Sequence, residues 1–363
     1  MKLVVFGLAV SSSWGNGHAT TYRALLGAFA ARGHEIVFYE WNAPWYGGGH
    51  RDLPDPPFCR LELYDRWERV RERATAETRD ADATLVGSYV HRGREVIDAL
   101  AGACVEPLFF YDIDTPVTVG LLRRGEAEYL RRDQVPVFTR YLSFTGGPFL
   151  QAVVEGELGA REAVPLYCSV DERVYGETSP QAEFAADLAY MGTYAEDRQP
   201  TLDRLLLEPA RRAGDRTFLV AGPQYPQAIR WPTNVRRLPH VPPSRHPAFY
   251  SSAAWQLNVT RAEMRAAGWS PSVRFFEAAA CGAALLSDRW PGIEHFLRPG
   301  EEILLPDSTE EVLGILAETH PDERRAIGAA ASSRILAEHT AERRAGELET
   351  LLAVSASAPP MPV

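Results

Sequence analysis

The stretch 270–277 combines residue types that can hold a negatively charged ligand. Ser270 followed by Pro271 is typical of a helix N-terminus, so we expect a helix over 271–281. Its first N–H groups attract anions, and Arg274 adds a positive charge beside them. The Glu277 carboxylate, three residues on and on roughly the same face, can accept hydrogen bonds from two adjacent hydroxyls. The spacing predicts a nucleotide diphosphate with its ribose; the alternative is a surface helix on which Arg274 and Glu277 pair with each other.

His18 lies in a glycine-containing loop between the first predicted strand and the first predicted helix. Gly15 and Gly17 precede it, and small residues there let an anion or a sugar approach the backbone N–H groups. The loop lacks the third glycine of the dinucleotide-binding fingerprint. Three roles fit His18: a general base on a substrate hydroxyl, since imidazole takes up protons near neutral pH, a contact to a bound phosphate or sugar, or packing.

Asp112 and Asp114 follow another predicted strand and form an Asp-x-Asp pair. We expect no metal there, because the chain has no His/Cys/Asp cluster with metal-ligand spacing. At the carboxyl end of a strand the two carboxylates can orient His18 or bind a substrate hydroxyl. A cap for the following helix is an equal alternative.

An aromatic-rich loop follows the second predicted strand. Trp41, Trp45 and Tyr46 are interrupted by Asn42 and Pro44, so they do not form one buried element. Aromatic faces stack on sugars and on apolar groups, and we predict that this loop contacts a substrate. Core packing is the alternative for some of these rings.

Composition bounds the class of protein. The 363 residues predict about two domains, and the net charge of −10 argues against a nucleic-acid or anionic-membrane partner. The four cysteines are far apart, as expected for buried thiols in a reducing compartment. We expect no secretory signal and no transmembrane helix, and therefore a cytoplasmic protein. The oligomeric state cannot be derived from the sequence.

Strands and helices alternate along both halves of the chain. In the first half we expect strands at 2–8, 35–39, 83–87, 107–111 and 140–144 and helices at 19–32, 64–78, 93–101, 118–131 and 147–156. In the second half we expect strands at 186–191, 216–221, 235–238, 254–260, 283–287 and 302–305 and helices at 200–212, 246–252, 271–281, 292–297, 309–318, 321–338 and 340–353. Crossover helices of this length predict parallel, doubly wound sheets.

The rhythm breaks near 165–183, which separates two predicted domains. The first domain spans 1–168 and the second 169–339, and the helix at 340–353 is expected to pack back on the first. The tail at 355–363 is expected to be disordered.

The segment Arg274–Asp288, together with Gly292–His295 and Pro299–Glu302, resembles the nucleotide-sugar half of group 1-like GT-B glycosyltransferases. It is most similar to the branch related to the spore-maturation CgeB proteins, and Glu338-His-Thr340 with Arg343 is similar to the ending of that branch. With the loop at His18, the resemblance covers about 3–350.

The resemblance implies an α/β fold of two Rossmann-like domains facing a cleft. It also implies a metal-independent enzyme without a cofactor, which moves a sugar from a UDP- or dTDP-type donor to a small-molecule acceptor. On the donor side it implies ribose binding by Glu277, diphosphate binding by Arg274, Arg261, Gly192 and Arg198, base contacts by His240 and Val241, and donor contacts by Gly15 and Gly17. On the acceptor side the expected catalytic residues are His18 and Asp114, and the expected contacts are Asp112, Trp41, Trp45 and Tyr46.

One position departs from the family pattern. Retaining members often carry a second glutamate eight residues before the ribose glutamate, and here that position is Trp269. The stereochemical outcome and the donor sugar are therefore open. A nucleotide-sugar 2-epimerase of the same architecture and a non-catalytic nucleotide-sugar-binding subunit remain as alternatives.

Overall fold

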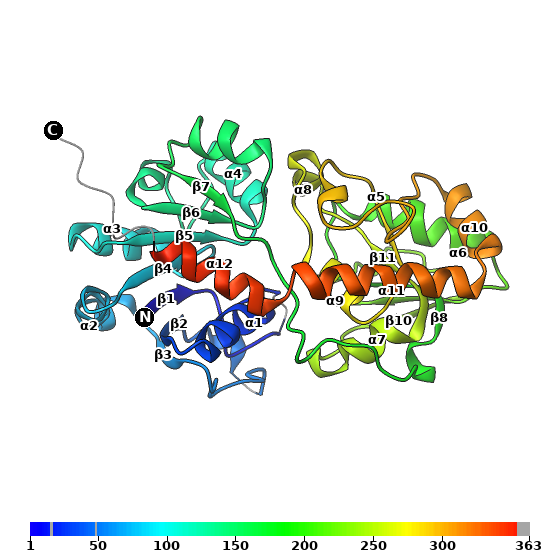
Figure 1. The fold of residues 1–363 in the computed structure, drawn as a ribbon, viewed down its shortest axis with the longest axis horizontal. Coiled ribbons are helices and arrows are strands. Elements are labelled where there is room, and N and C mark those ends of the chain that lie inside the picture. The colour runs from blue at the N-terminus through cyan, green and yellow to red at the C-terminus, as the bar shows by residue number, and fades with distance from the viewer. Residues whose placement is uncertain (15–16, 48, 354–363) are drawn as a thin grey trace. The chain divides into compact units, whose positions relative to one another are not determined.

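The computed structural model describes residues 1–14, 17–47 and 49–353. It divides into two compact units, one formed by Met1–Cys168 together with the chain from Ala341 onward, and one by Ser169–Thr340 (Figure 1). Each unit is built on its own parallel sheet. The tail predicted to be disordered, 355–363, lies outside the described residues.

The first unit contains a seven-stranded sheet in the order β3-β2-β1-β4-β5-β6-β7, and every neighbouring pair is parallel. Its strands are β1 (Lys2–Gly7), β2 (Glu35–Trp41), β3 (Arg60–Tyr64), β4 (Ala83–Gly87), β5 (Leu108–Asp112), β6 (Arg140–Ser143) and β7 (Ala163–Pro165). Its α-helices are α1 (His18–Ala31), α2 (Trp67–Arg79), α3 (Gly93–Gly102), α4 (Thr115–Arg124) and α12 (Ala341–Ala353), with short helical turns at Pro44–Tyr46, Arg132–Val137 and Leu150–Glu155. The strand order reverses between β1 and β4, the place where doubly wound sheets hold ligands.

The second unit contains a five-stranded parallel sheet in the order β10-β9-β8-β11-β12. Its strands are β8 (Ala186–Met191), β9 (Phe218–Ala221), β10 (Val235–Leu238), β11 (Ala253–Asn258) and β12 (Leu285–Ser287). Its α-helices are α5 (Gln199–Leu202), α6 (Glu208–Arg212), α7 (His246–Ser252), α8 (Ala262–Ala267), α9 (Val273–Ala280), α10 (Thr309–Glu318) and α11 (Pro321–Glu338). A π-helical segment, Asp203–Leu207, joins α5 to α6, and short 3-10 turns lie at Ala182–Phe184, Pro243–Arg245 and Ile293–His295.

The last helix, α12, packs along α1 in the first unit (red and blue in Figure 1). Arg32, at the end of α1, donates hydrogen bonds to Glu342 and Glu349 of α12, at 2.6 to 2.8 Å. Apolar α12 residues such as Leu348 and Leu352 are buried. The chain therefore returns to its first sheet after completing the second.

Most predicted elements are confirmed, and the start of α9 was predicted wrongly. The helix begins at Val273, and the N-cap position is Ser272, whose φ of −85° and ψ of 153° are extended. Ser270 and Pro271 stay in the preceding loop, where Gly268 and Trp269 both have positive φ. The loop conformation thus delays the helix by two residues, and Arg274 becomes its second residue.

Three other differences concern strands and helix ends. The edge strands β3 and β7 were not predicted, because the alternating sequence of β3 also fits an amphipathic helix and β7 has only three residues. The helix predicted at 118–131 is α4, which ends at Arg124 because Gly125 adopts φ 74°. The strand predicted at 302–305 is reduced to isolated bridges such as Leu286 with Leu304.

Two helical glycines in the second unit predict opposite effects on stability. A Cβ at Gly328 in α11 would lie 2.3 Å from the Gly282 carbonyl oxygen, whereas a Cβ at Gly314 in α10 would have open space around it. Gly314→Ala should therefore stabilise by about 0.5–1 kcal/mol through the lower entropy of the unfolded chain. Gly328→Ala should destabilise by about 1–3 kcal/mol, because backbone must move. Urea unfolding of both variants checks the signs, and a stabilising Gly328→Ala would contradict the described packing of α11.

Candidate active site

The N-terminus of α9 is attached to the sheet of the second unit by a buried asparagine. Asn258 ends β11, and its Oδ1 accepts a hydrogen bond from Ser272 Oγ at 2.8 Å and one from Arg274 Nη1 at 3.5 Å. Its Nδ2 donates to Ser287 Oγ, at the end of β12, at 2.9 Å. The carboxyl ends of two strands and the positive end of a helix therefore meet at one amide.

Arg274 reaches from α9 over the end of β8. Its guanidinium carbon lies 5.1 Å from the centre of the Tyr190 ring. A Cβ at Gly192, just after β8, would lie 2.5 Å from the Tyr190 hydroxyl and 2.8 Å from Arg274 Nη2, so a larger residue would require these two side chains to move. Tyr225 holds the same turn by donating a hydrogen bond to the Gly192 carbonyl at 3.2 Å. The predicted pair Gly192 and Arg274 is thus in direct contact.

Arg198 and Arg261 lie in the loops that follow β8 and β11. Arg198 Nη2 donates to the Thr193 carbonyl at 2.6 Å, while its buried Nε has no hydrogen-bond partner among the described residues. Arg261 Nε lies 3.5 Å from Asp197 Oδ2, an ion pair that lacks hydrogen-bond geometry. A buried guanidinium N–H without an acceptor calls for an explanation, and a bound anion supplies one.

Arg237 is a further arginine of this region that the sequence analysis did not identify. Its guanidinium carbon lies 4.1 Å from the centre of the Tyr225 ring and 4.0 Å from that of Trp231. Its Nη2 donates to the Gly222 carbonyl after β9 at 3.1 Å. Burial raises the pKa of Tyr225, while the nearby charges of Arg198, Arg237 and Arg274 act in the opposite direction. Three guanidiniums therefore surround one phenol.

Glu277 is buried, and its hydrogen bonds differ from those of Arg274. Its Oε2 accepts a hydrogen bond from the Tyr250 hydroxyl at 2.9 Å. His246 Nδ1 lies 3.9 Å from the same oxygen, and the Tyr175 hydroxyl lies 3.2 Å from His246 Nδ1. Since Glu277 bonds to Tyr250 and Arg274 to Asn258, the alternative of a simple Arg274–Glu277 surface pair is wrong.

His246 links Glu277 to the residues predicted to contact the nucleobase of the donor. Burial lowers the pKa of His246, so the ring is neutral near pH 7. With Nε2 donating to the Val241 carbonyl at 3.1 Å, Nδ1 is left to accept from the Tyr175 hydroxyl. His240, exposed after β10, lies close enough to His246 to affect its charge. The predicted ribose and base positions are therefore neighbours.

Asp288 is a buried acid at the same edge of the sheet that was not predicted as a site residue. It follows β12, and its Oδ1 accepts hydrogen bonds from the backbone N–H and the hydroxyl of Thr260, both at 3.0 Å. Its buried Oδ2 has no hydrogen-bond partner among the described residues. Burial raises the pKa of Asp288 to about 6.

In the first unit, His18 and Asp114 lie together. His18 is the first residue of α1, and its Nε2 lies 3.6 Å from Asp114 Oδ2. Its ring meets the edge of Tyr89, with centroids 5.3 Å apart, and its buried Nδ1 bonds to none of the described residues. Gly17 occupies the N-cap position of α1, and Gly15 lies outside the described residues.

Asp112, in contrast, is completely buried. Its carboxylate accepts hydrogen bonds from the hydroxyls of Tyr141 and Thr118 and from the Asp114 backbone N–H. Burial raises its pKa to about 6. These bonds hold the turn between β5 and α4, so the carboxylate positions Asp114 in this structure; its predicted contact to an acceptor remains a prediction.

Two carboxylates hold the loop between β1 and α1. Buried Glu40 accepts hydrogen bonds from the backbone N–H groups of Val10 and Ser11, at 2.7 and 2.9 Å, and pairs with Arg51. Asp52 accepts from the Ser13 N–H at 2.9 Å and from Arg23, which together lower its pKa. The loop that leads to His18 is thus attached at several points.

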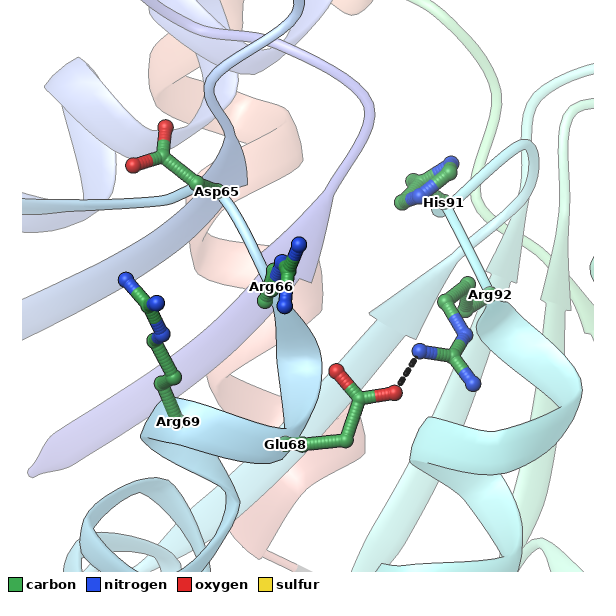
Figure 2. Close-up of a pocket in the computed structure, with 6 residues that line it drawn as sticks. All are labelled: Asp65, Arg66, Glu68, Arg69, His91 and Arg92. Atoms are coloured by element: carbon green, nitrogen blue, oxygen red, sulfur yellow. Dashed lines mark hydrogen bonds and ion pairs between the residues drawn. The ribbon is translucent and has the colours of Figure 1, made fainter.

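A surface pocket of about 410 Å³ lies where α2 and α3 begin (Figure 2). It is lined by charged residues and a histidine: Asp65, Arg66, Glu68, Arg69, His91 and Arg92. Glu68 pairs with Arg92 across it. The sequence analysis missed this pocket because it did not predict β3, which ends just before Asp65.

The predicted aromatic loop borders this pocket. Trp41 stacks on His91, with ring centroids 3.8 Å apart and planes 13° apart, and its Nε1 donates to the Asp65 carbonyl at 3.2 Å. Trp45 is 53% exposed and meets Trp41 edge-on, whereas Tyr46 is buried against Ala9 and Ala43. Two exposed or half-buried indoles therefore lie beside a charged pocket.

The described residues contain no group of three or more His, Cys, Asp or Glu side chains arranged to hold a metal ion. No helix in the described part of the chain combines the length and apolarity that crossing a membrane requires.

Comparison with known proteins identifies the class of fold. Sucrose-phosphate synthase from Thermosynechococcus elongatus is 14% identical, with a TM-score of 0.68, and the match covers 98% of this chain and 100% of that chain. HepE from Anabaena, solved with UDP and glucose, is 11% identical, with a TM-score of 0.67 and coverage of 98% and 100%. An α-glucosyltransferase solved with UDP is 11% identical, with a TM-score of 0.69 and coverage of 97% and 100%. An α-glucosyltransferase solved with UDP and a 13-mer DNA is 13% identical, with a TM-score of 0.67 and coverage of 97% and 99%.

Residues 198–350 match the family model described as glycosyl transferase-like. No curated protein sequence matches the chain. The structural matches confirm the predicted α/β GT-B architecture. The family-model match over residues 198–350 agrees with the predicted class of enzyme, a glycosyltransferase. The relation to the CgeB branch and the individual site residues remain predictions.

Asp288→Asn should change the pH dependence of stability. Folding raises the pKa of Asp288 to about 6, from an unfolded value of about 3.9. Between these values the folded state retains a proton that the unfolded state has released, so the free energy of unfolding falls as pH rises. An asparagine amide cannot ionise, so from pH 4 to 7 the variant should gain on the order of 2–3 kcal/mol relative to wild type. Urea unfolding at a series of pH values measures this difference, and a difference that is constant with pH would contradict it.

Proposed function

We propose that the protein transfers a sugar from a nucleoside-diphosphate donor to a small acceptor, with the donor bound by the second unit. The observation that carries the proposal is Arg274 at the N-terminus of α9, bonded to Asn258, on the same helix as the buried carboxylate of Glu277. Arg198 and Arg261, in the loops after β8 and β11, each have a buried Nε without a hydrogen-bond acceptor among the described residues. Guanidiniums and helix N–H groups suit a diphosphate, and a carboxylate suits a ribose diol. Gly192, beside Arg274, would let the diphosphate approach the backbone.

A UDP- or dTDP-type donor is proposed. Structural neighbours solved with UDP support this choice. His240 and the backbone of Val241 would contact the nucleobase, since His246 connects this turn to the cluster around Glu277. The relation to the CgeB branch and a cytoplasmic location are proposed on the sequence alone. The net charge of −10 favours a small acceptor over nucleic acid, although one neighbour was solved with DNA.

The chemistry would use His18 as the base. The acceptor hydroxyl oxygen forms a bond to C1 of the donor sugar, its proton passes to the imidazole, and the bond from C1 to the diphosphate breaks. Asp114, 3.6 Å from His18 Nε2, would stabilise the imidazolium. The arginines and the α9 N-terminus would stabilise the charge on the leaving diphosphate without a metal. Gly17 would line this site, and Trp41 and Trp45 would lie on the acceptor side, while the buried Asp112 would position Asp114.

Glu277→Ala should weaken UDP binding while the protein remains folded. Loss of hydrogen bonds between a carboxylate and the ribose hydroxyls should cost about 1.5–3 kcal/mol, or roughly 10- to 150-fold in Kd. Calorimetry with UDP measures the change, and Glu263→Ala on the neighbouring helix α8 is the control. An unchanged UDP affinity in a folded Glu277→Ala variant would remove this carboxylate from the site.

His18→Ala should lower kcat about 10²- to 10⁴-fold, because the variant lacks the general base. UDP affinity should stay unchanged, because the residues predicted to bind the donor, apart from Gly15 and Gly17, all belong to the second unit. His320→Ala, at an exposed position, is the control. A role in binding phosphate predicts weaker UDP binding instead, and a packing role predicts a lower Tm with normal turnover. A kcat near that of wild type would refute the role of His18 as the general base. Exchange of the sugar C2 proton with solvent, in place of transfer, would identify an epimerase.

A further inference from the structure

Trp269 has a backbone conformation that is unusual for its side chain. Its φ is 43°, in the left-handed region that residues with large side chains rarely occupy. The preceding Gly268 also has positive φ, and the Trp269 N–H donates to the Pro291 carbonyl at 2.7 Å. The loop before α9 is therefore held against the loop after β12 in a conformation that presents this indole.

The indole lies face-on over Gly292. A Cβ at Gly292 would lie 2.3 to 2.5 Å from Cδ2, Cε2 and Cγ of Trp269, three atoms of the five-membered ring at nearly equal distances. One face of the ring is therefore covered by the Gly292 backbone. Trp269 is nevertheless partly exposed, so the residue is not enclosed on all sides.

The order of groups in a nucleotide sugar indicates that the donor sugar lies near Trp269, and this step rests on the proposed function. Ribose, two phosphates and sugar follow one another in such a donor. Glu277 is the fifth residue of α9, about 6 Å along the axis from its first residue. A donor with its ribose at Glu277 and its phosphates at the helix N-terminus extends its sugar beyond Ser272. The loop at 268–272, with Trp269 in it, lies there.

We propose that Trp269 forms an apolar wall of the donor-sugar site and selects a sugar that turns C–H groups or a methyl group toward it, as a deoxy sugar does. An indole face offers no strong acceptor to a sugar hydroxyl but packs well against C–H groups. A site built from hydrogen-bonding groups rejects an analogue that lacks the hydroxyl by a large factor, whereas an apolar wall does not.

The test compares UDP, UDP-glucose and its 3-, 4- and 6-deoxy analogues by calorimetry. In wild type, at least one deoxy donor should bind within threefold of UDP-glucose or more tightly. Trp269→Glu should weaken that deoxy donor about tenfold or more relative to UDP-glucose, Trp269→Phe should retain the wild-type preference, and UDP alone should bind each variant equally. Rejection of all three deoxy donors by wild type, or an unchanged preference in Trp269→Glu, would overturn the proposal. Failure of UDP itself to bind would instead contradict the proposed function.

A second pair of variants displaces the ring without removing it. Gly292→Ala places a methyl group in the space of the indole, whereas Gly300→Ala adds one in open space at nearly the same φ, 85° against 86°. Gly292→Ala should weaken the preferred deoxy donor severalfold and leave UDP binding unchanged, and Gly300→Ala should change neither. Equal effects of the two variants would show backbone strain rather than contact with the indole, and would overturn the proposal.

Discussion

The arrangement of the second unit depends on the hydrogen bonds of one buried side chain, Asn258. An amide has an acceptor side and a donor side, and this one directs its oxygen to Ser272 and Arg274 of α9 and its nitrogen to Ser287 and Thr260. Because Asn258 is buried, each of these bonds forms in a low-dielectric setting where an unpaired group would be costly. The helix N-terminus is therefore held at one place and in one orientation relative to the ends of β11 and β12.

The arginine side chains of this region are also held in fixed positions by neighbouring groups. Arg237 is held between two aromatic rings and bonds to the Gly222 carbonyl, Arg198 bonds to the Thr193 carbonyl, and Arg274 lies over Tyr190. These cations are positioned by backbone carbonyls and aromatic rings rather than neutralised by bidentate carboxylates. Positive charge that is fixed before a ligand binds needs little reorganisation when negative charge develops on a leaving group.

The periodic features of the sequence predicted the fold well. Apolar runs and crossover helices identified most strands, since buried parallel strands such as β4 and β5 read as continuous apolar segments. The edge strands β3 and β7 were missed, β3 because polar residues alternate with its apolar ones and β7 because it has only three residues. The start of α9 was misplaced because Ser-Pro is a local signal, whereas the positive φ values of Gly268 and Trp269 arise from contacts with Pro291 and Gly292.

Residues of the candidate site were predictable only where they belong to a recognisable sequence motif. Arg274 and Glu277 are recognisable from their spacing, and Gly192 from the resemblance to a known family. Arg237 and Asp288 are not, because their roles depend on contacts with Tyr225 and Thr260, 12 and 28 residues away along the chain. The pocket beside Trp41 was missed for a similar reason: its two sides come from segments more than 20 residues apart that β3 and β4 bring together.

A crystal structure of the protein with UDP tests the central claim most directly. The account predicts the diphosphate within hydrogen-bond distance of Arg274 and the first N–H groups of α9, and the ribose hydroxyls at the carboxylate of Glu277. UDP bound at another place, or electron density for UDP that is absent at saturating concentration, would contradict it.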